Sequence, residues 1–145
     1  MANAKIIAQT HTRMRRLRVE QHGSEHHLKF EQDTDAIQSA IDMQRPHKLV
    51  MENLRYLLGI LLFIPKPERI LILGVGAGSL IQFLRYHLPQ AHITGVEYDA
   101  ELIPFAQEHL QLPRADEHLT YEIEEARQFL NINRDQFDLI LVDIF

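Results

Sequence analysis

The stretch that decides the fold is Arg69-Ile-Leu-Ile-Leu-Gly-Val-Gly-Ala-Gly-Ser-Leu80. It opens with an apolar run, typical of a strand covered on both faces of a parallel sheet. Gly74, Gly76 and Gly78 then allow a sharp turn and a close approach to a ligand, because they carry no Cβ. Leucine and isoleucine continue at helical spacing after the turn. This order predicts a nucleotide site, since the N–H groups at a helix start favour an anionic or hydroxyl-rich ligand.

The composition indicates a globular protein of one domain, with or without a small appendage. The 145 residues carry a formal net charge of −5, and the only basic cluster lies between Arg13 and Arg18, so no nucleic-acid partner is expected. Those arginines are expected on the solvent side of a strand. The absence of cysteine excludes disulfides and thiolate metal sites. Neither a secretory signal nor a membrane span is evident, because the apolar run Leu57–Ile64 is too short, and a cytoplasmic location is expected.

From residue 69 onward, strands and helices are expected to alternate. Such alternation implies right-handed crossovers and a parallel sheet, so the fold class is α/β with a doubly wound sheet. The chain stops directly after the fourth strand, and the sheet is therefore expected to be incomplete, as the first half of a larger domain. The expected strands cover residues 69–73, 91–97, 119–123 and 137–143, and the expected helices cover 79–88, 100–110 and 126–131.

The residues before this alternation predict a smaller unit. Weak alternation over residues 13–31 predicts a β-hairpin, and residues 46–63 predict a buried helix that begins at Pro46. We therefore expect an N-terminal hairpin segment over 1–42 and a nucleotide-binding domain over 43–145. His22, His26 and His27 are expected in a solvated hairpin loop rather than at a metal, because no paired carboxylate spacing completes a site.

Acidic side chains follow the strands where a doubly wound sheet collects its ligands. Glu97 ends a strand about twenty residues beyond the glycine turn, where a carboxylate accepts hydrogen bonds from ribose hydroxyls. The alternative is that Glu97 and Asp99 only start the next helix. Glu125 could accept from an adenine amino group, although Glu124 is equally placed and both could simply open a helix. Asp143 would face the crevice and could hold an amine or act as a base.

The spacing of the glycines bears on the ligand class. A dinucleotide fold prefers G-x-G-x-x-G, and the third position of that pattern is Ser79 here. The tighter spacing of Gly74, Gly76 and Gly78 favours an S-adenosylmethionine-type ligand over a nicotinamide dinucleotide.

These motifs together resemble those of the spermidine synthase family, the polyamine aminopropyltransferases, which share a class I methyltransferase-like Rossmann fold. Gln38-Ser-Ala-Ile-Asp42 resembles the segment that joins that family's N-terminal β-domain to its nucleotide domain. The resemblance continues through the glycine turn. It is completed by Val96-Glu-Tyr-Asp99, Glu124-Glu-Ala-Arg127 and Phe137-Asp-Leu-Ile-Leu-Val-Asp143.

The resemblance implies a transferase that uses decarboxylated S-adenosylmethionine or S-adenosylmethionine as donor, a polyamine as acceptor, no metal and a homodimer. Gln38 and Glu125 would bind the donor with Glu97, and Asp143 would be the catalytic aspartate. Ala77 stands where the family usually has an aspartate for the donor's amino group, and His47 where it often has a tyrosine in the diamine pocket. The alternatives are a methyltransferase and a non-catalytic nucleotide-binding or dimerising relative.

Overall fold

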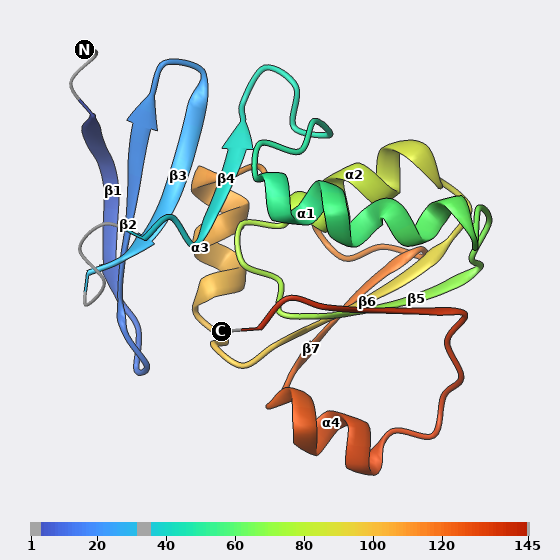
Figure 1. Cartoon of the computed structure of the whole chain (residues 1–145). Helices are drawn as coiled ribbons and strands as arrows, with labels where there is room; N and C mark the ends of the chain where they lie inside the picture. The colour runs from blue at the N-terminus through green and yellow to red at the C-terminus, as the bar shows by residue number, and fades with distance from the viewer. Residues whose placement is uncertain (1–3, 32–35, 145) are drawn as a thin grey trace.

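Two four-stranded sheets organise the computed structural model, which describes residues 4–31 and 36–144 (Figure 1). The first sheet is antiparallel, in the order β1-β2-β3-β4, with strands β1 (Lys5–His11), β2 (Arg16–His22), β3 (Glu25–Phe30) and β4 (Ser39–Asp42). The second sheet is parallel, in the order β7-β6-β5-β8, with strands β5 (Arg69–Leu73), β6 (His92–Glu97), β7 (Leu119–Ile123) and β8 (Leu139–Val142).

The parallel sheet and its crossover helices confirm the predicted α/β fold. The chain moves from β5 to β6 and β7 on one side, and then places β8 on the other side of β5. The strand order therefore reverses between β5 and β8, and a ligand crevice is expected outside the carboxyl ends of strands at such a point. The crossover helices are α2 (Ser79–His87), α3 (Leu102–His109) and α4 (Ala126–Ile132).

The two faces of the parallel sheet are covered by different elements, as Figure 1 shows with α4 below the sheet and α2 above it. Alternate residues of β5 point to opposite faces, so Ile70 and Ile72 join the larger core whereas Leu71 packs against Phe129 of α4. The larger core also takes in Leu17, Val19 and Leu28 of the antiparallel sheet. The two sheets thus share one continuous apolar core.

The predicted hairpin is present, but it is part of a larger sheet. Strands β2 and β3 pair antiparallel around a turn at Gly23, and β1 and β4 add a strand on each side. The histidines expected in a solvated loop lie instead in β2 and β3, so that prediction was wrong. His26 contacts the backbone carbonyl oxygen of His109 at 3.0 Å. His22 contacts the carboxylate of Glu20, and His27 contacts that of Glu25.

The predicted helix over 46–63 was wrong at its start. Helix α1 (Glu52–Leu57) begins six residues later and continues as a 3-10 turn, η1 (Leu58–Leu62). Residues 43–48 form turns in which the Asp42 carboxylate accepts from the Gln44 amide at 3.1 Å, and Leu49 then forms a β-bridge with Ile41. The bridge holds this segment extended, and only Leu54 and Leu58 of the helical region are buried.

Polar contacts fix the antiparallel sheet against the parallel one. The Thr12 hydroxyl donates to the Asp99 carboxylate at 2.7 Å, and both side chains are buried. The Arg13 amide donates to Glu101 at 2.7 Å, and the Ser79 hydroxyl donates to the Ala40 carbonyl at 3.0 Å. The antiparallel sheet is therefore held beside the carboxyl ends of β5 and β6.

Candidate functional site

Backbone hydrogen bonds continue past the ends of the parallel strands and bring their polar tips together. The Gly74 amide donates to the Val96 carbonyl at 2.9 Å, and the Glu124 amide donates to the Glu97 carbonyl at 3.1 Å. On the other side of β5, the Asp143 amide donates to the Leu73 carbonyl at 2.8 Å. Neighbouring strand ends thus present the glycine turn and three acidic residues at one edge of the sheet.

The Glu97 carboxylate is directed at the glycine turn. One of its oxygens accepts from the Val75 amide at 3.2 Å, with the Gly76 amide 3.5 Å away, and the other accepts from the Asp99 amide at 3.0 Å. The side chain is only 9% exposed, yet it lines the cleft described below. These bonds fix the orientation of an acceptor that retains lone pairs for ligand hydroxyls. The alternative, that Glu97 only starts the next helix, does not account for its contact with the turn.

The glycines of the turn have distinct roles. All three have positive φ, and a Cβ at Gly74 or Gly78 would collide with Asp143 or Leu112, respectively. Gly76 is different, because a Cβ there would meet only Ser39 at ordinary contact distance. Gly74 and Gly76 line the cleft, whereas Gly78 is the N-cap of α2 and serves packing.

The cleft has a volume of about 240 Å³ and lies between the two sheets. One wall is built from the strand ends of the parallel sheet and the other from the antiparallel sheet. Six residues predicted from the sequence line it: Gln38, Gly74, Gly76, Glu97, Glu125 and Asp143. The structure brings these side chains and backbone atoms together, and their individual roles stay predictions.

Glu124 and Glu125 are distinguished by their hydrogen bonds. The Glu125 carboxylate caps α4, accepting from the amides of Arg127 at 2.9 Å and Gln128 at 3.0 Å. Glu124 accepts only from the Glu125 amide, at 2.9 Å, among the side-chain bonds of the described residues. Glu125 therefore fits the helix-opening alternative, although it also lines the cleft.

Asp143 combines access to the cleft with a perturbed acidity. The residue is partly buried, and burial raises the pKa of its carboxyl group above the ordinary value. A carboxylate with raised pKa binds a proton more readily than a solvated one, which suits a group that receives a proton from an attacking amine.

The antiparallel wall supplies residues that the sequence did not predict for the site. Arg15, expected on the solvent side of a strand, instead lies just before β2 and lines the cleft, with its guanidinium carbon 4.3 Å from the centre of the Phe30 ring. Arg16 and Arg18 do lie in β2. Phe30 and Ser39 also line the cleft. Only the pairing of β1–β4, which is non-local, reveals these neighbours.

His47 does not lie in the cleft. Its ring stacks on Tyr86 of α2 with centroids 3.9 Å apart, away from the strand ends. A role for His47 in the cleft that holds Asp143 therefore has no support in this conformation.

Among residues 4–31 and 36–144, no group of three metal-ligating side chains is placed to hold an ion. No helix in these ranges is long and apolar enough to cross a membrane.

Comparisons with known proteins agree with this architecture. The sequence profile of the methyltransferase domain matches residues 70–144, just over half of the chain. A polyamine aminopropyltransferase from Chromobacterium violaceum is 32% identical over 112 residues, which are 77% of this chain and 43% of that protein. The chain thus spans less than half the length of this curated relative.

Two solved structures share the fold. A probable spermidine synthase from Corynebacterium glutamicum superposes with a TM-score of 0.83 and 24% identity, over 97% of this chain and 53% of that one. A spermidine synthase in complex with the transition-state analogue AdoDATO gives a TM-score of 0.72 and 17% identity, over 97% of this chain and 47% of that one.

The chain belongs to the methyltransferase-domain family. Within that fold it is spermidine synthase-like, because its sequence is similar to that of a polyamine aminopropyltransferase over 77% of the chain and a probable spermidine synthase shares its fold over 97% of it.

Proposed function

We propose that the cleft binds an S-adenosylmethionine-type donor and that the complete site transfers the donor's aminopropyl group to an amine. The observation that carries this proposal is the Glu97 carboxylate, held at the end of β6 beside the Gly76 amide of the turn that follows β5, next to the point where the strand order reverses. A ribose there would find an oriented acceptor, and its adenine would lie toward Glu124 and Glu125. Gly76 lines the cleft, and the lack of a side chain there leaves its backbone accessible to such a ligand.

The residues of the chain would position the reactants. The donor supplies a carbon made electrophilic by its sulfonium. Gln38 and Arg15 would contact the donor from the antiparallel wall, and Asp143 would hold the amine in line with that carbon. As the nitrogen–carbon bond forms and the carbon–sulfur bond breaks, the amine proton would pass to the Asp143 carboxylate. The raised pKa of Asp143 supports this role.

A methyltransferase is the second candidate, and Ala77 favours it. This residue is fully buried in the turn, so no acidic side chain is present at that position to select a donor by its aminopropyl amine. An intact methionine moiety would then be accepted as well as a decarboxylated one.

A thermal-shift panel followed by turnover distinguishes these candidates. A ligand at about one hundred times its dissociation constant adds roughly 2.7 kcal/mol to the unfolding free energy. Preference for decarboxylated S-adenosylmethionine, together with aminopropyl transfer by the full-length gene product, would support the proposal. Preference for S-adenosylmethionine would support the methyltransferase. Stabilisation by NAD alone would refute both, and binding without turnover would indicate a non-catalytic relative.

We further propose a cytoplasmic homodimer, with the antiparallel segment over 1–42 and the nucleotide-binding part over 43–145 as its two units. The family resemblance supports the dimer, and β4 ends at Asp42. Light scattering across a range of concentrations tests the dimer, and a monomer throughout would refute it.

A further inference from the structure

A second cavity lies at the opposite end of helix α2 from the glycine turn. Helix α2 has nine residues, so its two ends are separated by about 13 Å, and the two cavities share no lining residue. The second cavity is a shallow groove of about 640 Å³. Its lining residues are Arg45, His47, Lys48, Leu49, Arg55, Phe83 and His87.

The charged residues of this groove all have the same sign. Arg45, Lys48 and Arg55 line it, and no carboxylate of the described residues does. Asp42 offsets part of this charge, since its carboxylate lies 3.3 Å from the Arg45 guanidinium. Lys48 has no carboxylate partner among the described ion pairs. The groove is therefore cationic in a chain whose formal net charge is −5.

Arg55 is fixed in place rather than freely mobile in solvent. Its guanidinium donates two hydrogen bonds to the Leu49 carbonyl, from Nε at 3.0 Å and from Nη2 at 2.8 Å. A guanidinium with five N–H donors retains others after these bonds. Because its geometry is already set, less side-chain entropy is lost when it binds an anion.

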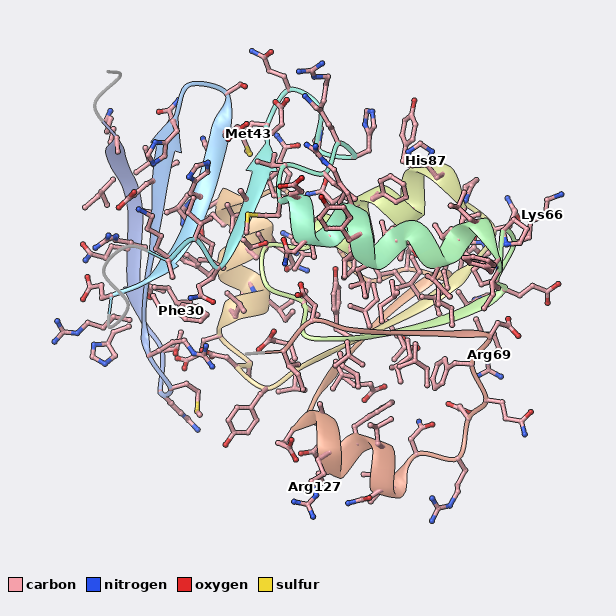
Figure 2. All side chains as sticks on the ribbon, in the orientation of Figure 1. Phe30, Met43, Lys66, Arg69, His87 and Arg127 are labelled. Carbon is pink, nitrogen blue, oxygen red and sulfur yellow. The ribbon has the colours of Figure 1, made fainter. Side chains whose placement is uncertain are left out.

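Aromatic rings form the remaining side of the groove. The His47 ring is stacked on Tyr86 with centroids 3.9 Å apart and planes inclined by 9°, and His87 contacts Phe83 with centroids 4.3 Å apart. Figure 2 shows His87 at the end of α2. Flat rings next to fixed cations suit a ligand that carries both a planar group and an anion.

We propose that this groove binds a small organic phosphate, with the phosphate on Lys48 and Arg55 and a planar ring against His47 and Phe83. Arginine and lysine commonly bind phosphate in proteins, and the buried residue Leu49 gives the groove an apolar part of its lining. This site is distinct from the cleft and does not depend on the function proposed for it.

Titration calorimetry of the full chain with uridine monophosphate and with inorganic phosphate tests the proposal. Lys48→Glu should weaken the binding of uridine monophosphate by about tenfold or more, because it reverses a charge next to a dianion. Lys66→Glu is the matched control, since it makes the same change in net charge on an exposed loop residue outside the groove (Figure 2). It should change the affinity by less than about twofold. Lys48→Gln should give an intermediate loss.

Further variants separate the two parts of the ligand. His87→Ala should weaken the binding of uridine monophosphate more than that of inorganic phosphate, whereas Glu122→Gln, at an exposed residue that lines neither cavity, should leave the binding of both unchanged. If Lys48→Glu and Lys66→Glu lose the same affinity for uridine monophosphate, the proposed site is wrong. The same conclusion follows if the unmodified chain shows no saturable binding at millimolar ligand. If inorganic phosphate binds as tightly as uridine monophosphate, the assignment of the ring to the groove is wrong.

Discussion

Replacing Glu97 by alanine is the most direct perturbation of the proposed donor site. In the complex, the carboxylate would accept from both ribose hydroxyls, and a hydrogen bond to a charged group contributes about 1.5–3 kcal/mol. Losing two such bonds should cost about 3–6 kcal/mol, which raises the dissociation constant by more than about one hundredfold. The Val75 and Gly76 amides also lose their acceptor, so the unfolding free energy should fall by about 1 kcal/mol.

Titration calorimetry with methylthioadenosine and with S-adenosylmethionine measures the first effect, and urea unfolding measures the second. Glu122→Gln serves as the control, because Glu122 is an exposed residue of β7 that does not line the cleft. The control should bind like the unmodified chain. If Glu97→Ala is folded and also binds like the unmodified chain, Glu97 does not hold the ribose and the proposed orientation of the donor is incorrect.

Three further predictions concern stability. Gly78→Ala should lower the unfolding free energy by about 2 kcal/mol in urea denaturation, because φ is +83° and the new Cβ would meet Leu112; a neutral result would show that the turn can relax. The Lys29 ammonium, 2.8 Å from Glu20, lowers the pKa of that carboxyl. The stabilisation of the folded state by this ion pair is therefore fully present above the unfolded-state pKa of about 4.3, and it is lost as pH falls through the folded-state pKa. Glu20→Gln should therefore flatten the acid limb of the stability curve, and an unchanged limb would count against this pair. Burial raises the pKa of Asp143, so Asp143→Asn should increase the unfolding free energy at pH ~7, and this gain should disappear below about pH 3.9. The same variant should abolish aminopropyl transfer. A loss of stability at neutral pH would contradict the burial argument.

The parallel sheet could be predicted because its signals are local. The apolar run before Gly74 and the helical spacing after it each lie within one element, and the resulting bounds agree with the structure to within about two residues for most elements. The position of Glu97 beside the glycine turn was expected for the same reason, since the end of β6 must lie beside the turn that follows β5, while its role stays a prediction. These inferences need only the rules of crossover connections.

Of the antiparallel wall, only the hairpin of β2 and β3 could be predicted, because the pairing of β1 and β4 with it has no clear local signal. Strand β4 has four residues, too few to show alternation, and eight residues of the sequence separate it from β3, with which it pairs. The helix expected to begin at Pro46 failed because the bridge between Ile41 and Leu49 outweighs local helix preference. Arg15 illustrates the functional result, since its place in the cleft depends on how the antiparallel sheet pairs and packs against the parallel one.

The hydrogen bond between Thr12 and Asp99 joins the antiparallel sheet to the parallel one beside the cleft, so the shape of the cleft depends on both parts of the chain. A nucleoside held between Phe30 and Gly76 would join segments more than forty positions apart in sequence, and would therefore act as a cross-link that forms only in the folded state. Saturating nucleoside should slow amide hydrogen exchange in β2 and β3 even though the proposed ribose acceptor, Glu97, lies on β6. If the cleft binds adenosine as proposed, ligand binding and the docking of the first sheet are coupled.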